Sequence, residues 1–354
     1  MVTVSIVNVT SYTALELLRL LAQHPQFVVT SVTGRSAVGK RLGDVFPQLH
    51  ALPSLHAAMN PELVITAEPA KTDLAFVCLP HAAAAESVLK LLEQGTKVVD
   101  LSADFRLHDA NIYTEWYKHT HPAPACLETT VYGLCERYRD RIIDASLVAN
   151  PGCYATTSIL ALIPALAAGI IHPGIIIDAK SGVSGAGRTP SLTTLYGEVN
   201  ENINAYSLDG HRHLPEIIQE LEAAASDGGN AVTAQLRVTF IPHLMPMTRG
   251  ILATCYADLK QNVLTTEDVR VLYEKYYVNE PFVHVVDQSP HTKWSYGSNH
   301  CFIHPFVDTR TQRLVVVSCL DNLVKGAAGQ ALQNANILYG LPEITGLMAL
   351  AVYP

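Results

Sequence analysis

The segment LAFVCLPHAAAAESVLKLLEQGTKVVDL, residues 74–101, decides the fold class. It opens with an unbroken apolar strand candidate, Leu74–Leu79, and continues into an alanine-rich helix candidate, His81–Gln94, which Gly95 closes. A second strand candidate, Lys97–Leu101, follows directly. Strand, helix and strand in alternation predict a parallel sheet, and continuous apolar strands are typical of a sheet covered on both faces.

The residues upstream repeat the same alternation. Val2–Val7 is a β-branched strand candidate, Tyr12–Gln23 has leucines at helical spacing, and Phe27–Val32 is the next strand candidate. We therefore expect an α/β fold whose first domain, residues 1–149, is a doubly wound, Rossmann-type dinucleotide-binding domain.

Further along, the pattern changes. Residues 103–138 predict loops and short helices, and a short strand at Leu147–Ala149 leads into a helix near Cys153. Antiparallel patterning with intervening helices predicts a second, α+β domain over residues 150–320, and a final amphipathic helix, residues 321–340, is expected to pack back on the first domain. The strand candidates of the second domain are Ile175–Ala179, Gln235–Ile241, Ile251–Tyr256, Phe282–Val286, His300–Phe306 and Leu314–Leu320.

Composition excludes several classes of protein. The net charge of −8 is spread over 24 basic and 32 acidic residues without a basic run, so nucleic acid is not an expected partner. Seven scattered cysteines without a CxxC pair predict neither a disulfide framework nor a metal site. The N-terminus has no signal-peptide pattern, and Pro164 interrupts the longest apolar stretch, Ile159–Ile171, so we expect no membrane association and a cytoplasmic location.

The turn after the first strand departs from the usual dinucleotide pattern. It reads NVTSYTA, residues 8–14, and holds no glycine where backbone normally approaches a pyrophosphate. An ordinary turn with Thr10 or Ser11 as helix N-cap fits equally well. After the second strand, TGRS, residues 33–36, has no acid for a ribose, and Arg35 suits a 2′-phosphate. That pair of observations favours NADP, with a solvated loop arginine as the alternative.

One cysteine stands in a setting that suits chemistry. In ANPGCYAT, residues 149–156, a strand ends in a sharp Pro-Gly turn and a helix begins at Cys153. The positive end of a helix dipole favours the thiolate, which is the form that attacks an acyl carbon. The competing interpretation is a buried structural cysteine, and the other six, in strands or loops, are expected to be of that kind.

Two further motifs contain candidate site residues. GHRHLPE, residues 210–216, precedes a helix and offers two histidines that titrate near neutral pH around Arg212. KSGVSGAGR, residues 180–188, has three glycines that permit close approach of backbone to a ligand, although such loops are of low specificity.

Taken in order, six motifs resemble those of N-acetyl-γ-glutamyl-phosphate reductases, a family grouped with the semialdehyde dehydrogenases. The resemblance extends from about Val4 to the C-terminus and is carried by NPGCYAT, KSGVSGAGR, GHRHLPEI, FIPHLMPMTRGI, KWSYGSNH and DNLVKGAAGQA. It implies NADPH-dependent reduction of N-acetyl-glutamyl phosphate to the semialdehyde in arginine biosynthesis, by a homotetramer or homodimer whose partner is a small-molecule acyl phosphate.

The resemblance also implies roles for individual residues. Cys153 matches the nucleophile and His211 the acid/base residue. The implied cofactor-binding residues are Thr10, Ser11, Tyr12, Thr13, Arg35 and Ser36 in the first domain and Ser184, Gly185 and Asn322 at the nicotinamide end. The implied substrate-binding residues are Asn150, His213 and Glu216, with Arg106, Arg188 and Arg249 as candidate anion binders.

The chain departs from the family pattern in its first turn. Glycines are replaced by Asn8, Ser11 and Ala14, and the Cβ of Ser11 stands where backbone is expected to approach phosphate. Two alternatives therefore remain open: an aminoadipyl-phosphate reductase of lysine biosynthesis, with the same chemistry, or a non-catalytic relative with weakened cofactor binding.

Overall fold

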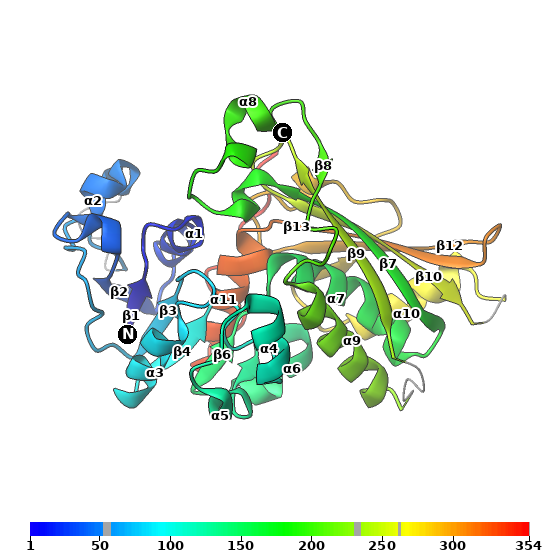
Figure 1. Ribbon diagram of the computed structural model, residues 1–354, viewed down its shortest axis with the longest axis horizontal. Coiled ribbons are helices and arrows are strands. Elements are labelled where there is room, and N and C mark those ends of the chain that lie inside the picture. Colours follow the sequence, from blue (N-terminus) through cyan, green and yellow to red (C-terminus); the bar gives the residue numbers. More distant parts are fainter. Residues whose placement is uncertain (52–57, 230–234, 261–262, 354) are drawn as a thin grey trace. The chain divides into compact units, whose positions relative to one another are not determined.

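The computed structural model describes residues 1–51, 58–229, 235–260 and 263–353, and the chain divides into two compact units (Figure 1). Unit 1 comprises Met1–Pro151 and Ala327–Ala349, and unit 2 comprises Gly152–Gly326 and Leu350–Pro354. The sequence had suggested a division between residues 149 and 150. It did not suggest that the last residues return to unit 2, where Val352 N donates to Tyr296 O.

Unit 1 is built on a six-stranded sheet of order β2-β1-β3-β4-β6-β5, in which every pair is parallel. The prediction of a doubly wound Rossmann-type domain is confirmed. Because β2 and β3 lie on opposite sides of β1, the chain reverses direction across the sheet there, and such a switch point is where open α/β sheets bind ligands. The strands are β1 (Val2–Val7), β2 (Phe27–Val32), β3 (Leu74–Val77), β4 (Lys97–Asp100), β5 (Val131–Tyr132) and β6 (Leu147–Ala149).

The helices of unit 1 connect these strands in chain order. Their core-facing residues are apolar: Leu17, Leu18 and Leu21 of α1 and Val88 and Leu91 of α3 are fully buried. The helices are α1 (Tyr12–Leu21), α2 (Leu42–Val45), α3 (Ala85–Glu93), α4 (Ala110–Tyr117), α5 (Pro124–Leu127) and α6 (Cys135–Ile142), with 3-10 turns at Arg35–Ala37 and Pro47–Ala51.

The last helix of unit 1, α11 (Gly329–Leu338), corrects the predicted amphipathic helix. All ten of its residues are buried, and it packs against α1, α6 and β4. Its polar side chains are amides that have partners within the protein: Gln330 Nε2 and Asn334 Nδ2 each donate to Gly133 O at 2.8 Å, and Gln333 Nε2 donates to Glu343 Oε2 at 2.9 Å. The polar stripe in the sequence therefore faces protein and not water.

Unit 2 is built on a seven-stranded sheet of order β11-β12-β13-β10-β7-β9-β8. The antiparallel pattern expected from the sequence is only partly right, because β7 with β9 and β11 with β12 pair in parallel. Between β7 and β9 the chain passes through α9, and a helical crossover of this kind makes strands parallel. The strands are β7 (Ile171–Gly182), β8 (Asn204–Ala205), β9 (Arg237–Met245), β10 (Ile251–Leu259), β11 (Val283–Val285), β12 (Cys301–Asp308) and β13 (Arg313–Leu320).

Three helices, α7 (Cys153–Ala167), α9 (Leu214–Asp227) and α10 (Thr266–Tyr276), lie together on one side of this sheet (Figure 1). The buried strand residues alternate with partly exposed ones, as Ile251, Ala253 and Cys255 of β10 do with Leu252 and Thr254. A short helix, α8 (Tyr196–Val199), and 3-10 turns at Val183–Ala186, Leu192–Thr194 and Thr292–Trp294 lie in the connections. A π-helix, Val324–Ala328, leads the chain out of unit 2.

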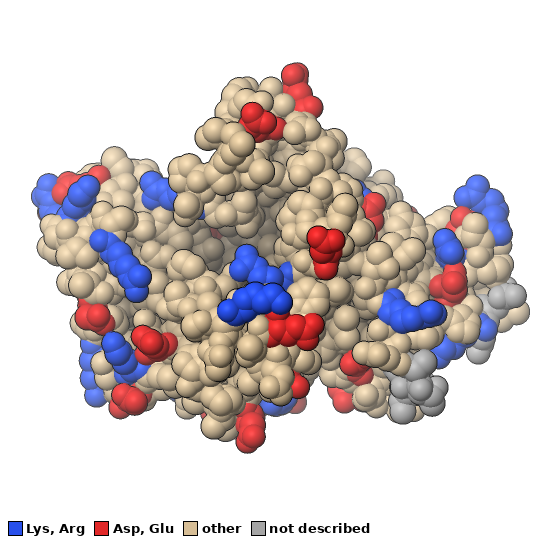
Figure 2. Space-filling model, viewed as in Figure 1, with Lys and Arg blue, Asp and Glu red and all other residues tan. Residues whose placement is uncertain are grey.

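The charged side chains of the described residues and the length of their apolar helices bear on possible partners and on membrane insertion. Figure 2 shows basic and acidic side chains interspersed over the face in view. No helix among the described residues combines the length and the apolar character required to cross a membrane.

Candidate active site

The predicted nucleophile turn is present as the sequence indicated. Strand β6 ends at Ala149 and α7 begins at Cys153, with Gly152 as an N-cap that makes no side-chain capping hydrogen bond. Cys153 is partly exposed, and as the first residue of a fifteen-residue helix it lies at the positive end of the helix dipole.

A second cysteine also begins a helix, which the sequence analysis did not anticipate. Cys135 is the first residue of α6, but it is fully buried and its thiol donates to Asn334 Oδ1 at 3.1 Å. Exposure, and not position on a helix alone, distinguishes Cys153 from Cys135.

The nucleophile turn is held from α9. Gly152 N donates to Glu216 Oε1 at 2.8 Å, and the Glu216 side chain is almost completely buried. Thr156 adds two hydrogen bonds to Gly152 O, one from its main-chain nitrogen and one from its hydroxyl. Helix α7 packs directly on α9, so the turn is fixed to the helix that follows the histidine motif.

His211 lies just ahead of α9 among aromatic rings. Tyr154, Tyr206 and Phe240 each meet its ring edge-on, with ring centroids 5.5 to 5.8 Å from that of His211. Tyr206 donates from its hydroxyl to that of Tyr154 at 3.2 Å, and Tyr154 donates to His243 O at 3.2 Å.

The same tyrosines connect His211 to the nucleophile. Burial, with a smaller contribution from the charge of Cys153, raises the pKa of Tyr206 to about 12. The pKa of Tyr154 is likewise raised, first by burial, with contributions from Tyr206 and from Cys153. Both tyrosines flank the His211 ring and lie close enough to Cys153 for its charge to affect their pKa, so the predicted nucleophile and the histidine share these two neighbours.

The glycine-rich segment has a partly different role from the one expected. A Cβ at Gly182 would lie 2.8 Å from main-chain atoms of Thr248 and Arg249, so this glycine serves close contact within unit 2 and not with a ligand. Ser184, in the turn that follows, accepts a hydrogen bond at 2.9 Å from Asn322 Nδ2.

The side-chain amide of Asn322 forms a hydrogen bond through its oxygen and another through its nitrogen. Its Oδ1 accepts from Gly250 N at 2.8 Å, while one N–H binds Ser184. The second N–H of the amide leaves a donor at the position that the family resemblance gives to the nicotinamide.

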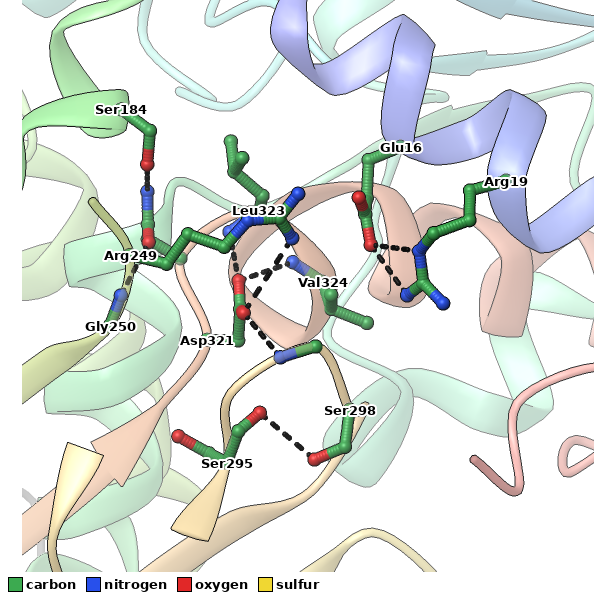
Figure 3. Close-up of polar contacts among 12 residues, drawn as sticks. Glu16, Arg19, Ser184, Arg249, Gly250, Ser295, Ser298, Asp321, Leu323 and Val324 are labelled. Carbon is green, nitrogen blue, oxygen red and sulfur yellow. Dashed lines mark hydrogen bonds and ion pairs between the residues drawn. The ribbon is translucent and has the colours of Figure 1, made fainter. Parts of the chain in front are cut away.

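Asp321, which the sequence analysis overlooked, organises the turn beside Asn322 (Figure 3). It is fully buried; Oδ1 accepts from Leu323 N and Val324 N, and Oδ2 accepts from Gly297 N at 2.7 Å. Arg249 Nη1 lies 3.7 Å from the same Oδ2, and the arginine side chain is 22% exposed. A buried carboxylate thereby holds one predicted anion binder in place.

Gly326 is a second residue that sequence analysis missed. A Cβ at this position would lie 2.8 Å from the Cβ of Cys153, so no larger residue fits beside Cys153 without a shift. Gly326 N donates to Asp321 O, five residues back, which is the hydrogen bond that defines a π-helix. Such bulges are frequent at functional sites. A bare glycine in KGAAG gives no signal of this contact.

The predicted residues divide between the two units. Unit 2 contains Cys153, Ser184, Gly185, Arg188, His211, His213, Glu216, Arg249 and Asn322, and unit 1 contains Thr10, Ser11, Tyr12, Thr13, Arg35, Ser36, Arg106 and Asn150. Within unit 2 the structure joins Cys153, His211 and Glu216 through α7 and α9, and Asn322 with Ser184.

In unit 1, the glycine-free turn adopts an ordinary geometry. Asn8 has a left-handed backbone, φ 67°, and its Nδ2 donates to Cys78 O at 2.8 Å. Ser11 is the N-cap of α1, in extended backbone, and its Oγ accepts from Ala14 N at 3.1 Å. Of the three positions where the family pattern has glycine, only Asn8 therefore has a backbone conformation that favours glycine, and Ser11 is unstrained.

Other predicted residues of unit 1 differ in exposure. Arg35 and Ser36 are exposed, and Arg35 makes no hydrogen bond or ion pair with the described part of the chain. Arg106 is buried; its Nε donates to Asn150 O at 2.7 Å and its Nη2 to Leu101 O at 2.9 Å. Arg106 thus supports the strand end ahead of the nucleophile, and its predicted contact with substrate remains a prediction.

Two family models match the chain: the NAD binding domain of semialdehyde dehydrogenases over residues 3–145, and their dimerisation domain over residues 153–322. An N-acetyl-gamma-glutamyl-phosphate reductase of Dehalococcoides mccartyi (strain CBDB1) is 52% identical over 350 residues, 99% of this chain and 98% of that protein. The chain belongs to the N-acetyl-gamma-glutamyl-phosphate reductase family. The resemblance inferred from the six motifs is confirmed.

Other members of the reductase family match over similar lengths. The protein of Heliobacterium modesticaldum is 48% identical and that of Moorella thermoacetica 46% identical, over 100% and 98% of both chains respectively. Aspartate semialdehyde dehydrogenase II of Vibrio cholerae shares the fold, with a TM-score of 0.68 at 16% identity over 96% of this chain and 99% of that one. The Candida albicans aspartate semialdehyde dehydrogenase, solved with NADP, has the same TM-score at 14% identity, with 96% and 99% coverage.

Proposed function

We propose that this chain reduces N-acetyl-glutamyl 5-phosphate to the 5-semialdehyde with NADPH and releases phosphate, as a step of arginine biosynthesis. The observation that carries the proposal is the partly exposed Cys153 at the start of α7, in a turn that Glu216 holds to the helix that His211 precedes. Relatives named N-acetyl-gamma-glutamyl-phosphate reductase at 46–52% identity over nearly the whole chain favour this substrate over an aminoadipyl phosphate.

The residues of unit 1 fit a dinucleotide. The N-terminus of α1 follows β1 at the switch point of the sheet, where phosphate groups bind main-chain N–H groups. Thr10, Tyr12 and Thr13 would hold the pyrophosphate, and exposed Arg35 with Ser36 would hold the 2′-phosphate that distinguishes NADP. When bound, NADPH supplies the hydride. At the nicotinamide end we assign Ser184, Gly185 and Asn322, whose amide retains one donor.

Cys153 forms the covalent intermediate in this proposal. Its thiolate attacks the acyl carbon, the bond from that carbon to the phosphate oxygen breaks, and phosphate leaves with the electron pair. Main-chain N–H groups at the uncapped start of α7 stabilise the negative oxygen that develops on the acyl group. The thioester accepts hydride, and His211 acts on the oxygen of the resulting hemithioacetal before the aldehyde departs.

Substrate recognition is assigned to cations around this centre. Arg249, fixed by Asp321, and exposed Arg188 are placed to bind the phosphate or the carboxylates. Asn150 and His213 are assigned to substrate binding, together with Arg106 and Glu216. Because Arg106 and Glu216 are buried and bind main-chain atoms of the turn ahead of α7, they act on the substrate by positioning that turn.

The decisive assay runs the reaction in reverse. N-acetylglutamate semialdehyde, NADP and phosphate should yield NADPH with the purified protein, and an aminoadipate semialdehyde derivative at the same concentration should not. Absence of turnover together with normal NADPH binding in a cofactor titration would contradict the proposal. Absence of both would indicate a non-catalytic relative.

We further propose that the chain acts as a homodimer or homotetramer in the cytoplasm. A row of apolar side chains crosses four strands on the open side of the unit 2 sheet, in the order Phe306, Val315, Tyr256 and Ile176. Phe306 and Ile176 are 42% and 44% exposed, so a second copy would bury them. All seven cysteines are free thiols, as expected in a reducing compartment.

A further inference from the structure

Asn8 replaces a glycine of the family pattern, and its side chain makes hydrogen bonds that a glycine cannot make. Its Nδ2 donates at 2.8 Å to the main-chain oxygen of Cys78, the residue that follows β3. A carbonyl oxygen only accepts, so this bond fixes which way the amide is turned. The amide oxygen, Oδ1, accepts from the Thr10 hydroxyl at 3.3 Å. The side chain therefore links the end of β3 to the residue just ahead of the N-cap of α1.

The main chain around Asn8 is bound to a third strand end. Asn8 N donates to Thr33 Oγ1 at 3.2 Å, and Val9 N donates to Thr33 O at 2.7 Å. Thr33 is buried and directly follows β2, two positions ahead of Arg35, to which we assign the 2′-phosphate. Asn8 thus joins the carboxyl ends of β1, β2 and β3 at the switch point of the sheet.

The backbone of Asn8 shows what the side chain adds. Its φ of 67° is left-handed, a conformation that asparagine adopts more readily than most residues and that glycine adopts without cost. Glycine at this position would also be free to leave that conformation, because it has no side chain to restrict it. Asn8 therefore permits the same turn as glycine and restrains it with two further hydrogen bonds.

The hydroxyl groups at the start of the turn are already engaged within the protein. The single hydroxyl proton of Thr10 is directed at Asn8 Oδ1, so only the lone pairs of that hydroxyl remain. Ser11 Oγ accepts from Ala14 N at 3.1 Å, and the Ser11 side chain is also hydrogen-bonded to the Cys78 side chain. Neither hydroxyl is therefore a ready donor to a phosphate oxygen.

The next two residues have the opposite character. Tyr12 N and Thr13 N, in the first turn of α1, have no acceptor among the residues that the structure describes. The Thr13 hydroxyl likewise has no partner within this part of the chain. Two N–H groups and one hydroxyl at the positive end of a ten-residue helix are donors that suit a phosphate.

We propose that Asn8 is a positioning residue for the cofactor, which holds the turn ahead of α1 in its phosphate-binding shape before NADPH binds. Tyr12 N, Thr13 N and the Thr13 hydroxyl are then the donors to the pyrophosphate, and any contact of Thr10 comes from its main chain. The inference rests on the proposed function for the identity of the dinucleotide. It accounts for phosphate binding by a turn without glycine, because the order that a ligand would otherwise impose is already present.

The first test uses the ligand-free protein. Asn8→Gly keeps the left-handed backbone and removes both side-chain bonds, so amide hydrogen exchange over residues 9–14 should be about tenfold faster than in wild type. The control is Lys118→Gly, which removes an exposed side chain from another left-handed residue of unit 1, φ 54°, at the end of α4. It should leave exchange over residues 9–14 as in wild type. Equal exchange in wild type and Asn8→Gly would overturn the proposal.

The second test separates the pyrophosphate from the rest of the cofactor. Calorimetry compares NADP with adenosine 2′-monophosphate, which has the 2′-phosphate but no pyrophosphate. We expect Asn8→Gly to raise Kd for NADP about tenfold and Kd for adenosine 2′-monophosphate less than twofold. An unchanged Kd for NADP would contradict a positioning role. Equal losses for both ligands would show that Asn8 serves the fold alone, which is also contrary to the proposal.

The third test concerns the donors. Thr13→Val and Thr10→Val each remove a hydroxyl at nearly constant volume, and Thr13→Val should weaken NADP binding the more, by about tenfold. The reverse order would refute the assignment of donors. A wild-type protein that binds neither NADP nor adenosine 2′-monophosphate would count against the proposed function. The exchange measurement needs no ligand, so it decides separately whether Asn8 orders the turn.

Discussion

Two turns lead from a strand into a helix, one ahead of α1 and one ahead of α7, and different hydrogen bonds stabilise them. Ahead of α1 the bonds are local: Ser11 caps the helix, and Thr10 donates to Asn8 Oδ1. Ahead of α7 no side chain caps Gly152, and the turn is held through its backbone by Glu216, 64 residues further along. The turn ahead of α7 is thus held by a residue of another helix, and no side chain caps the positive end of α7 beside Cys153.

The largest effect should come from the thiol at the uncapped turn. We expect Cys153→Ser to lower turnover by roughly 10³-fold or more, as for loss of a nucleophile, while fold and NADPH binding persist. Cys135→Ser is the matched control, since Cys135 also begins a helix but is buried against Asn334, and it should keep most activity. A Cys153→Ser protein that retains more than a few per cent of the wild-type rate would refute covalent catalysis.

The next effect concerns the anchor of that turn. Glu216→Ala leaves Gly152 N without its acceptor at a buried position, which costs about 1–3 kcal/mol, or roughly 5–150-fold in kcat if the cost appears in the transition state. Glu216→Gln keeps an acceptor oxygen and should lose less. Steady-state kinetics and thermal unfolding should show falling kcat and Tm at constant KM for the acyl phosphate. A rise in KM alone would instead place Glu216 in contact with substrate.

At the α1 side the expected effects are smaller. Arg35→Ala should raise KM for NADPH about tenfold and leave KM for NADH nearly unchanged, because one charge-assisted hydrogen bond to the 2′-phosphate is lost. Lys71→Ala, another exposed cation of unit 1, serves as the control. Equal changes for both cofactors would show that Arg35 does not bind the 2′-phosphate.

The smallest effect tests the capped turn itself. Ser11→Gly frees Ala14 N for a phosphate oxygen, so NADPH should bind about threefold more tightly by calorimetry, while the loss of the cap costs a few tenths of a kcal/mol in stability. Ala14→Gly, within the buried face of α1, should only lower the free energy of unfolding by about 1 kcal/mol. Weaker binding by Ser11→Gly would mean that the hydroxyl itself binds phosphate.

The same contrast explains what the sequence could predict. The nucleophile turn, the helix after the histidine motif and the N-cap Ser11 depend on residues a few positions apart, so local spacing predicted them. Asp321, Gly326 and the Glu216 tether depend on residues brought together from distant segments, and nothing in DNLVKGAAG or HLPE marks those contacts. The prediction that the polar face of α11 meets solvent was wrong for the same reason. The carbonyl that accepts from Gln330 and Asn334 belongs to Gly133, far away in the sequence.

The return of residues 327–349 to unit 1 has a consequence for biosynthesis. Helix α11 completes a core whose sheet ends with β6 at Ala149, about 180 residues earlier in translation. Until the ribosome has released α11, the main-chain oxygen of Gly133 and the thiol of Cys135 lack their native partners, and the surfaces of α1 and α6 that it covers stay open. Unit 2, which needs no segment beyond Gly326 for its sheet, can form first. We therefore expect the dinucleotide-binding half, although made first, to be the last to mature and the one that depends on chaperones during synthesis.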